Sequence, residues 1–529
     1  MIRLKRKPLP HTPSLYDNVI GAAYIPDDHP LRKIRAAVDF SFVHDLVADL
    51  YHHSNGRPAY DPEVMVRLIF LQLQYKLSDR GVIERAQTDH AFRFFLGLDW
   101  NDELPHPTSL TKFRNRLGEE RFAAVFHGFL RQAIERNLVS NKRLMIDSYS
   151  VRADISTPGF RELLDRVIAK ALASLQDTAV DVAYLRAEHE GLRADKSYQL
   201  GSAFRKLLLD EWLSLAELVA EALEELAARS ESQQFTLELL NGALRRADNQ
   251  GKRNIKKDDL LSDVDPDARW NRKKRGRQTE PGFGEQFAVD EENGIVTHVA
   301  VTPGNTDDSE MLQAMVEGHI ENVGGKPDEA LADSKYGSGG NRAFLEGAGI
   351  GDQIACPPPK GHKRGMFSTV DFEIEFDAKG RPTVALCPAG ELSESPRRSK
   401  HKHAWVFHFS KAQCDGCSLR GRCSKQKRGR QMTVDQHFQL TQRARARQKS
   451  VAGKSAQITR MDIERQFAYQ QRQGGKRTRY RGLAKNRMLG WMWGMYLNVT
   501  RMARLFEESL SGSPVSNLYK PIQCGAGGT

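Results

Sequence analysis

Hydrophobic residues in the first quarter of the chain recur with the spacing of amphipathic helices. Between residues 61 and 136, apolar side chains return every three or four positions, which places them on one face of a helix. Ser78 and Asp79 are typical capping residues for one short helix, and Pro107 opens another. The pattern predicts an all-α N-terminal domain of residues 1–140. Two interpretations stay open for it, a helix-turn-helix unit and a helical bundle for dimerisation.

Shorter apolar runs beyond residue 140 have the length of buried strands. One run, residues 144–146, ends on Asp147, and another, residues 330–332, ends on Asp333. We expect both runs to be strands with a carboxylate at the end. Residues 286–302 hold two apolar runs around an Asn-Gly turn, which predicts a β-hairpin. Strands and helices mixed in this order are typical of an α/β fold.

Two long segments interrupt the mixed pattern. Apolar stripes at helical spacing predict a helical hairpin within an insertion at 160–270. Residues 357–448 begin Pro-rich, hold short strand-like pieces and contain a cluster of cysteines, which predicts a second insertion. Residues 511–529 are predicted to be a flexible tail. We therefore predict one mixed α/β domain of residues 141–510 with two insertions.

The length and composition exclude several classes of protein. With 529 residues, 40% of them hydrophobic, the chain is long enough for more than one domain and is not disordered as a whole. It has no apolar run of about 18 residues, and prolines follow the basic first residues where a signal peptide would be apolar. We therefore expect a cytoplasmic protein without a membrane partner. The 79 Lys and Arg against 67 Asp and Glu give a net charge of +12, which favours a polyanionic partner such as nucleic acid.

The basic residues are concentrated near the end of the chain. From Arg465 to Phe506 there are ten Lys and Arg and no acid, together with several aromatic residues. Basic side chains neutralise phosphates and aromatic rings stack on exposed bases, so this stretch predicts DNA binding. Trp491, Trp493 and Tyr496 are expected in the core instead. The residues predicted to contact DNA are Arg460, Arg472, Lys476, Arg477, Arg479, Arg481, Lys485 and Arg487.

Three acids form the candidate catalytic set. Asp147 and Asp333 end predicted strands, and Glu464 lies on a helix at the head of the basic stretch. An acid that faces a DNA-binding surface weakens phosphate binding unless a metal ion uses it. Carboxylates that hold two hard cations can activate the attacking oxygen and stabilise the leaving oxygen in polynucleotidyl transfer. The three acids are therefore candidate ligands of two Mg²⁺ or Mn²⁺ ions.

Asp290 and Asp307 compete with Asp333 for the second place in this set. Asp290 lies in the predicted hairpin turn, where Asp is favoured for the turn itself. Asp307 follows a Pro-Gly break and is expected to cap the next helix. Both explanations suffice without catalysis, so Asp333 is preferred, and Asp307 is expected to support the site.

Four cysteines form a second candidate site. Cys414, Cys417 and Cys423 are closely spaced, and Cys387 lies upstream, just before Pro388. Four thiolates can hold a tetrahedral structural Zn²⁺ ion that stabilises a small insertion. Reduced thiols without a metal stay open as the alternative, and so does a histidine in place of one cysteine. The histidines considered are His401, His403 and His437, whereas Cys356 and Cys524 are given no role.

Motifs along nearly the whole chain, taken in order, resemble one known family. They are Ile146-Asp147-Ser148, the run Val-Thr-Pro-Gly-Asn-Thr-Asp-Asp at 301–308, Ala332-Asp333-Ser334-Lys335-Tyr336, and Arg460 to Glu464 followed by Tyr480-Arg481-Gly482-Leu483. Together they resemble a DDE transposase of bacterial insertion sequences. The resemblance is to the branch with a helical N-terminal domain, a helical insertion after the first Asp, and a Cys-containing insertion before the Glu.

The resemblance implies a ribonuclease H-like catalytic core. Asp147, Asp333 and Glu464 are then the triad that holds two Mg²⁺ ions, and the enzyme nicks a strand at the element's end, whose freed 3′ hydroxyl attacks DNA. Arg460 matches the arginine of the family's Tyr-Arg-Glu-Lys signature. Glutamines stand at the positions of the signature's Tyr and Lys, namely Gln457 and Gln471.

The expected function is therefore DNA transposition by cleavage and strand transfer. The expected partners are double-stranded DNA, as the element's terminal inverted repeats and as target, and a second copy of the chain when paired ends are bound. Two alternatives stay open. One is a catalytically inactive DNA-binding protein derived from a transposase, and the other is a metal-dependent DNA endonuclease without strand transfer.

Overall fold

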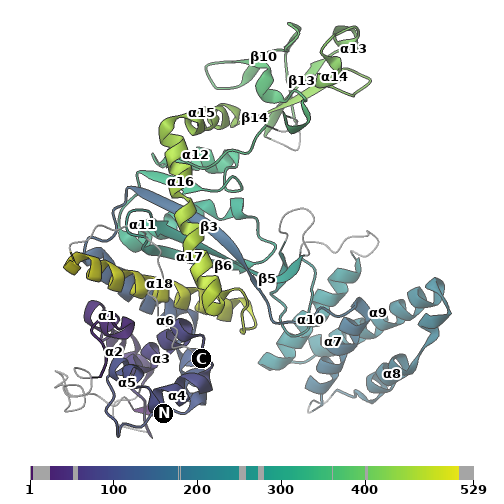
Figure 1. Cartoon of the computed structure of the whole chain (residues 1–529). Helices are drawn as coiled ribbons and strands as arrows, with labels where there is room; N and C mark the ends of the chain where they lie inside the picture. The colour runs from purple at the N-terminus through teal and green to yellow at the C-terminus, as the bar shows by residue number, and fades with distance from the viewer. Residues whose placement is uncertain are drawn as a thin grey trace.

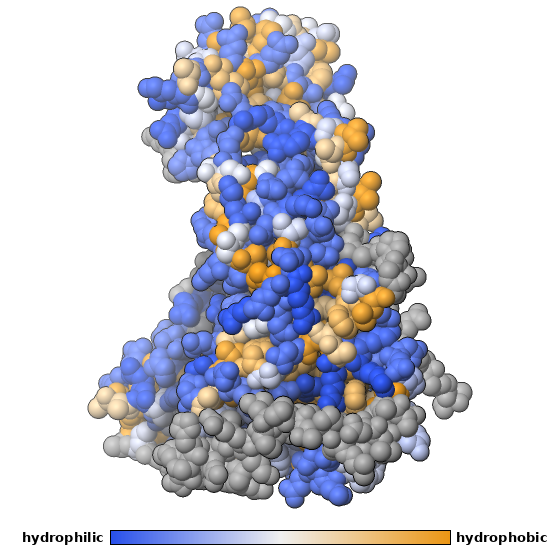
Figure 2. All heavy atoms as spheres, turned by 90° about the vertical axis from the view of Figure 1, so that its left-hand side faces the viewer, coloured by the Kyte–Doolittle hydropathy of each residue, from blue (hydrophilic) through white to orange (hydrophobic). Residues whose placement is uncertain are grey.

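The computed structural model describes residues 2–3, 24–51, 57–176, 178, 180–248, 258–271, 279–359, 362–399 and 403–511. The predicted tail beyond residue 511, His401 and Cys524 lie outside these residues. In Figure 1 a sheet occupies the centre, with one helical group below it on the left, another on the right, and a small β-rich part at the top. The side of the molecule seen in Figure 2 is mainly hydrophilic, with its hydrophobic residues in separate patches. Across the described residues, every helix is too short or too polar to cross a membrane.

The central sheet mixes antiparallel and parallel neighbours. Its six strands are β3 (Arg143–Arg152), β4 (Arg269–Asn271), β5 (Glu280–Asp290), β6 (Val296–Pro303), β7 (Glu329–Ala332) and β8 (Gly351–Asp352). They follow the order β4-β5-β3-β7-β8, and β6 pairs with β5. β5 is antiparallel to β3, whereas β7 is parallel to both β3 and β8. Parallel neighbours need a crossover connection, and α12 (Gly339–Gly347) supplies it between β7 and β8.

The β-hairpin predicted at residues 286–302 is confirmed, in a longer form. β5 and β6 pair antiparallel, and their outermost pair, Phe283 opposite Pro303, lies beyond the predicted limits at residues 286 and 302. Asp290 serves the turn, as predicted, because its carboxylate accepts hydrogen bonds from the backbone N–H of Ser140 at 2.9 Å and of Asn293 at 3.2 Å. Gly294 has a φ of 68°, a left-handed conformation that favours glycine.

β3 is longer than the strand predicted from residues 144–146. It continues past Asp147 to Arg152, because β5 pairs with it along its whole length. The prediction that this strand ends on Asp147 is therefore wrong. Ser148 and Ser150 follow Ile146 on one face of the strand, so the apolar alternation that marks a strand is lost in its second half.

The N-terminal part is helical, as predicted. Its helices are α1 (Pro30–Ala37), α2 (Val43–Val47), α3 (Pro62–Tyr75), α4 (Asp79–Thr88), α5 (His90–Leu96) and α6 (Pro107–Glu135). A two-residue pair of strands, β1 (Ile2–Arg3) and β2 (Arg57–Pro58), accompanies them. Ser78 caps α4, as predicted, since its hydroxyl accepts a hydrogen bond from the backbone N–H of Gly81 at 3.0 Å.

The last helix, α18 (Leu483–Ser511), joins the N-terminal helices to the sheet. It packs against α6 and against β6. One hydrophobic cluster runs from α1 through β3 to α18. Trp493 and Tyr496 are buried in this cluster, as predicted, and Trp491 packs against it while partly buried. The boundary predicted at residue 140 therefore does not separate two cores.

The segment between β3 and β4 forms a helical group with a core of its own. It holds α7 (Phe160–Ser174), α8 (Ala183–Ala194), α9 (Ser202–Glu224) and α10 (Glu231–Asp248). The predicted helical hairpin is therefore wrong, because the described residues of this segment form four α-helices. Two helices would leave much of the apolar surface of α9 uncovered, whereas α7, α8 and α10 all pack against it around the buried Trp212.

Two small antiparallel sheets make up the β-rich part at the top of Figure 1. They consist of β9 (Glu373–Phe376), β10 (Pro382–Leu386) and β11 (Leu392–Glu394), and of β12 (Arg397–Arg398), β13 (Ala404–Phe409) and β14 (Arg430–Asp435). Two one-turn helices, α13 (Lys411–Cys414) and α14 (Arg420–Cys423), lie between β13 and β14. α15 (Phe438–Lys449), α16 (Val451–Thr459) and α17 (Met461–Gln470) then lead the chain back to the sheet.

A glycine-to-alanine substitution tests the packing of α18 on β6. A methyl group on Gly490 would lie 2.6 Å from Cγ2 of Val301, so Gly490→Ala is expected to lower the free energy of unfolding by about 1–3 kcal/mol through overpacking. Gly347 of α12 is the matched control, because a methyl group there has no heavy atom within 4 Å. Thermal unfolding should show a lower midpoint for Gly490→Ala only; equal midpoints would contradict the close packing.

Candidate active site

The register of two parallel strands brings Asp147 and Asp333 together. The last residue pair between β3 and β7 is Ile146 opposite Ala332, and the next residue on each strand is an aspartate. Neighbouring strands lie about 4.8 Å apart, and residues at the same level of parallel strands point to the same face. Both carboxylates accordingly line one pocket.

Glu464 reaches the same pocket from α17. Phe467 of this helix is 5% exposed, and its ring centroid lies 5.1 Å from that of Tyr149 on β3. This contact holds α17 on the face of the sheet that carries Asp147. Glu464 lines the pocket with Asp147 and Asp333, and its side chain is 53% exposed. The three acids predicted from the sequence are therefore brought together.

Arg460 lies between two of these acids. Its Nη1 is 3.6 Å from Oδ2 of Asp147, and its Nη2 is 3.1 Å from Oε1 of Glu464. The arginine stands just before α17, four residues from Glu464, a spacing that places both side chains on one face of a helix. Arg460 also lines the pocket, so the arginine of the family signature lies beside the glutamate.

Negative charge is concentrated around Asp147. The pKa of Asp147 is raised from 3.8 to about 7, chiefly because the carboxyl group is buried. The backbone N–H of Ser148, 2.8 Å from Oδ1 of Asp147, and the guanidinium of Arg460 lower the pKa, whereas the carboxylates of Asp333 and Glu464 raise it. The two other acids are therefore close enough to act on the charge of Asp147.

Asp308 is a part of the site that the sequence interpretation missed. Its Oδ1 accepts a hydrogen bond from Oγ of Ser148, and its Oδ2 accepts one from Nζ of Lys335, both at 2.7 Å. Burial lowers the pKa of Lys335, but Asp308, Asp333 and Asp147 together raise it above its ordinary value. Asp308 thus holds a cation beside the two aspartates.

Asp307 has a different task from its neighbour. Its Oδ1 accepts a hydrogen bond from the backbone N–H of Ser309 at 2.9 Å and caps a short 3₁₀ turn. The predicted capping role is therefore confirmed, whereas the contacts to the site belong to Asp308. The paired aspartates of the 301–308 motif were the signal, and only the geometry separates their roles.

A buried hydrogen-bond network behind the pocket ties α17 to the sheet. Glu285 of β5 is 1% exposed and accepts hydrogen bonds from the hydroxyl of Tyr149 at 2.5 Å and from Nε2 of Gln470 at 3.0 Å. Tyr149 lies two residues beyond Asp147, and Gln470 ends α17. Burial raises the pKa of Glu285 from 4.5 to about 7, although both hydrogen bonds lower it. Sequence reasoning did not identify this acid.

The basic residues predicted to bind DNA lie around the connection from α17 to α18. A π-helical turn, Gln471–Gly475, begins it. The seven predicted side chains from Arg472 to Arg487 are exposed. Arg477 donates a hydrogen bond to Asp154, and Nη1 of Arg487 is 3.9 Å from Glu119. Among the described residues, no ion pair with an acid engages the other five.

The two glutamines at signature positions lie in different surroundings. Gln471 lines the pocket that holds the three acids. Gln457 lies on α16, where its Nε2 donates a hydrogen bond to the backbone oxygen of Gln353 at 2.9 Å. Gln471 is therefore placed to contact a bound ligand, whereas Gln457 fastens α16 to the segment that follows β8.

A second cluster with metal-ligating side chains lies among the N-terminal helices. His44, Asp61 and Glu63 place one ligand atom each within 4.8 Å of the others. The hydrogen bond from Nε2 of His44 to Asp61, 2.9 Å long, raises the pKa of His44 to about 9 against the effect of burial. In the absence of a metal ion, His44 and Asp61 form an ion pair at the start of α3.

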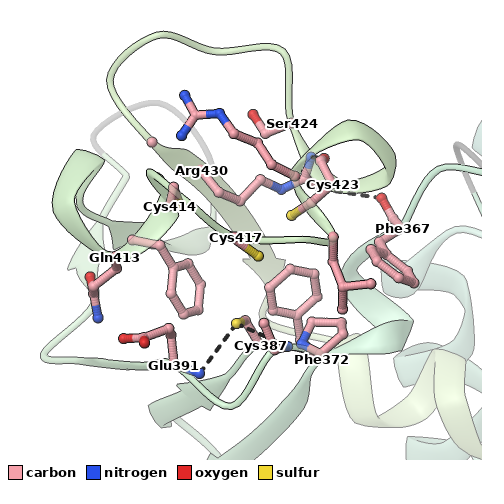
Figure 3. Close-up of a pocket in the computed structure, with 16 residues that line it drawn as sticks. Phe367, Phe372, Cys387, Glu391, Gln413, Cys414, Cys417, Cys423, Ser424 and Arg430 are labelled. Carbon is pink, nitrogen blue, oxygen red and sulfur yellow. Dashed lines mark hydrogen bonds between the residues drawn. The ribbon is translucent and has the colours of Figure 1, made fainter.

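The four cysteines predicted to bind zinc share one pocket. Cys387, Cys414, Cys417 and Cys423 all line it, whereas His403 and His437 do not. Figure 3 shows the sulfurs of Cys387, Cys417 and Cys423 facing this cavity. Cys356 lies elsewhere, where Nη2 of Arg342 contacts its sulfur at 3.2 Å.

Two segments of the chain match known protein families. Residues 21–116 match the family described as Transposase domain (DUF772), and residues 386–503 match the family described as Transposase DDE domain. The resemblance to DDE transposases of insertion sequences is thereby confirmed. The match to the Transposase DDE domain contains Arg460 and Glu464, while Asp147 and Asp333 lie outside both matched segments. Neither the curated proteins nor the solved structures include a significant match to the chain.

The buried charge of Glu285 should make stability depend on pH. Its folded pKa of about 7 lies above the ordinary 4.5, so the free energy of unfolding falls by up to about 3 kcal/mol as the pH rises from 4.5 through 7. Glu285→Gln keeps the side-chain shape and removes the charge. We expect the variant to gain thermal stability relative to the wild type between pH 5 and pH 8.

An exposed acid supplies the control for this experiment. Glu317 of α11 (Leu312–Val323) is exposed. The difference in thermal midpoint between Glu317→Gln and the wild type should therefore be the same at pH 5 and at pH 8. If the stability of Glu285→Gln relative to the wild type is as independent of pH as that of Glu317→Gln, then burial of a charged Glu285 does not destabilise the fold. This result would contradict the prediction.

Proposed function

We propose that the protein catalyses transposition, cutting DNA at the ends of an insertion sequence and joining the freed 3′ ends to target DNA. The observation that carries this proposal is that Asp147, Asp333 and Glu464, from three distant segments, line one pocket together with Arg460. The transposase family matches support the same function. Cleavage and joining are the same chemistry, an attack of an oxygen on a phosphodiester.

We further propose that the catalytic core is ribonuclease H-like, as the family resemblance implies. A mixed sheet supports this, in which an antiparallel half, β6-β5-β3, joins a parallel half, β3-β7-β8. The positions of two acids support this core as well. Asp147 lies on the central strand β3, and Asp333 follows the end of the parallel strand β7 beside it. The helical group after β3 and the β-rich part before α15 are then insertions into this core.

The donor set of the pocket suits two hard divalent cations. Mg²⁺ and Mn²⁺ prefer carboxylate oxygens, and Asp147, Asp333 and Glu464 offer three carboxylates to one pocket. A cation bound between them would offset the repulsion that Asp333 and Glu464 exert on a charged Asp147. Bound Mg²⁺ would activate the attacking oxygen and stabilise the leaving oxygen. Asp147, Asp333 and Glu464 are the residues that would hold it.

The residues around the acids have separate tasks in this proposal. Arg460 orients Glu464 through their 3.1 Å contact, and its guanidinium can grip a phosphate oxygen of the bound strand. Asp308 fixes Lys335 beside the pocket, where the ammonium group can neutralise a second phosphate. Gln471 lines the pocket at the point where the connection from α17 to α18 begins.

DNA would approach along the connection that follows α17. Arg472 comes directly after Gln471, so the exposed cations continue from the pocket along one stretch of chain. Cations that lack an acidic partner are available to phosphates. We propose that Arg472, Lys476, Arg479, Arg481 and Lys485, together with Arg477 and Arg487, bind the DNA backbone.

The N-terminal helices would supply the sequence-specific contacts to the terminal inverted repeats. Their match to a transposase domain supports a role in transposition, and their shared core with α18 couples them to the catalytic part. Two ends of one element must be held together for strand transfer, which favours a homodimer on paired ends.

Substitution of the three acids tests the proposed chemistry. Asp147→Asn, Asp333→Asn and Glu464→Gln should each reduce Mg²⁺-dependent cleavage by at least about 100-fold, because each removes a charged metal ligand. The assay is incubation of full-length protein with Mg²⁺, a DNA that carries the element's ends and a target plasmid. Glu317→Gln is the control and should keep full activity.

The products of this assay separate the proposal from its alternatives. Joined products from the wild type, and from none of the three variants, support the transposase. Cleavage without joining would indicate that the protein is an endonuclease and not a transposase. Binding of the DNA by wild type and variants alike, with no cleavage by either, would replace it by a DNA-binding protein.

The salt dependence of DNA binding tests the basic stretch. Each phosphate contact contributes nearly one unit to the slope of log affinity against log salt, so the double variant Arg479→Gln, Arg481→Gln should reduce that slope by about 2. The double variant Arg205→Gln, Lys206→Gln removes the same charge from exposed positions of α9. An equal loss of slope in both would contradict a local DNA-binding surface.

A further inference from the structure

Four cysteines converge at a place that the proposed reaction does not use. Cys387 directly follows β10, Cys414 ends α13, Cys423 ends α14, and Cys417 lies between these two helices. All four line one pocket where the two small sheets meet (Figure 3). Four cysteines from separate turns around one cavity are a typical ligand set for a metal ion.

The turn after Cys387 is arranged around its sulfur. The backbone N–H groups of Ala389 and Glu391 donate hydrogen bonds to Sγ at 3.4 and 3.3 Å. The N–H of Gly390 closes the turn onto the carbonyl oxygen of Cys387 at 2.9 Å, and Gly390 has a φ of 88°, which favours glycine. A protonated sulfur is a weak acceptor. Two donors directed at one sulfur therefore suit a thiolate that binds a metal.

The lining of the pocket also suits a negatively charged metal cluster. Phe372 and Phe409 exclude water on one side, while Arg420 and Arg430 line the pocket as well. Four thiolates around a divalent cation carry a net charge of −2, which guanidinium groups nearby offset in part. Nη1 of Arg430 donates a hydrogen bond to the backbone oxygen of Cys423 at 2.6 Å. This bond holds the guanidinium group next to one of the four cysteines.

The β-rich part has a small hydrophobic core. Its hydrophobic cluster holds six buried side chains, Phe372, Ala385, Phe407, Phe409, Met432 and Val434. Small cores of this kind usually need a disulfide or a metal ion. The five cysteines that the structure describes are free, without a disulfide between them. A metal ion is the remaining cross-link that this chemistry allows.

We propose that Cys387, Cys414, Cys417 and Cys423 bind one structural Zn²⁺ ion that fastens the β9-β10-β11 sheet to the β12-β13-β14 sheet. Four cysteine ligands complete a tetrahedron and leave no position for substrate, which is typical of structural zinc. The site lies outside the pocket of the three acids, so it does not depend on the proposed transposition chemistry.

Zinc binding requires the sulfurs to move closer together. No three of these sulfurs lie within 4.8 Å of one another, whereas Zn–S bonds of about 2.3 Å place the sulfurs of a tetrahedral site about 3.8 Å apart. Rotation about the Cα–Cβ bond moves a cysteine sulfur between rotamers without a change of the backbone.

The metal content of the full-length protein tests the proposal. Elemental analysis of wild type purified without chelators should find about one zinc per chain, and no iron. Cys417→Ser should lose most of this zinc. Cys356→Ser is the matched control and should keep it, because Cys356 lies outside the pocket. Asp147→Asn should also keep it, which separates failure of the zinc site from failure of the catalytic proposal.

A measurement on the wild type keeps the test valid if Cys417→Ser does not fold. Modification of the thiols should release zinc, and a strong chelator should lower the thermal midpoint, which added Zn²⁺ restores. Folded protein without zinc, iron in place of zinc, or zinc that Cys417→Ser retains in full would overturn the proposal.

Discussion

The pairing of β3 with β7 is the constraint on which the active site depends. Ile146 lies opposite Ala332, so the aspartates that follow share one level and one face of the sheet. A slip of one residue would turn one carboxylate to the opposite face. Hydrophobic packing on both faces prevents this: Met145 and Leu331 belong to the cluster shared with α17 and α18, whereas Ile146 and Ala332 belong to the cluster under α11 and α12.

The third acid depends on a segment that leaves the sheet and returns. Between Asp333 and Glu464 the chain forms α12, β8, the two small sheets and the helices α13 to α16, and it enters α17. The contacts of α17 with β3 and β5 hold Glu464 beside Asp147, through the ring of Phe467 and the buried Glu285.

The sequence predicted the parts of the site that have local signals. Asp147, Asp333 and Glu464 were predicted because each has a distinct local setting, at the end of an apolar run or at the head of an acid-free stretch. Glu285 was missed because its partner Gln470 is 185 residues away, and no local pattern indicates such a pair. The four helices after β3 were predicted as two because packing among helices, rather than periodicity, decides their number. The length of β3 was underestimated because pairing with β5 stabilises its polar second half.

The central claim is that three acids from distant segments form one metal site. Anomalous diffraction from crystals soaked with Mn²⁺ tests it directly, since the ion's position is observed without reference to activity. The account predicts manganese within coordination distance of Asp147, Asp333 and Glu464. Manganese bound elsewhere, for example only at His44, Asp61 and Glu63, or no manganese at the three acids, would contradict it.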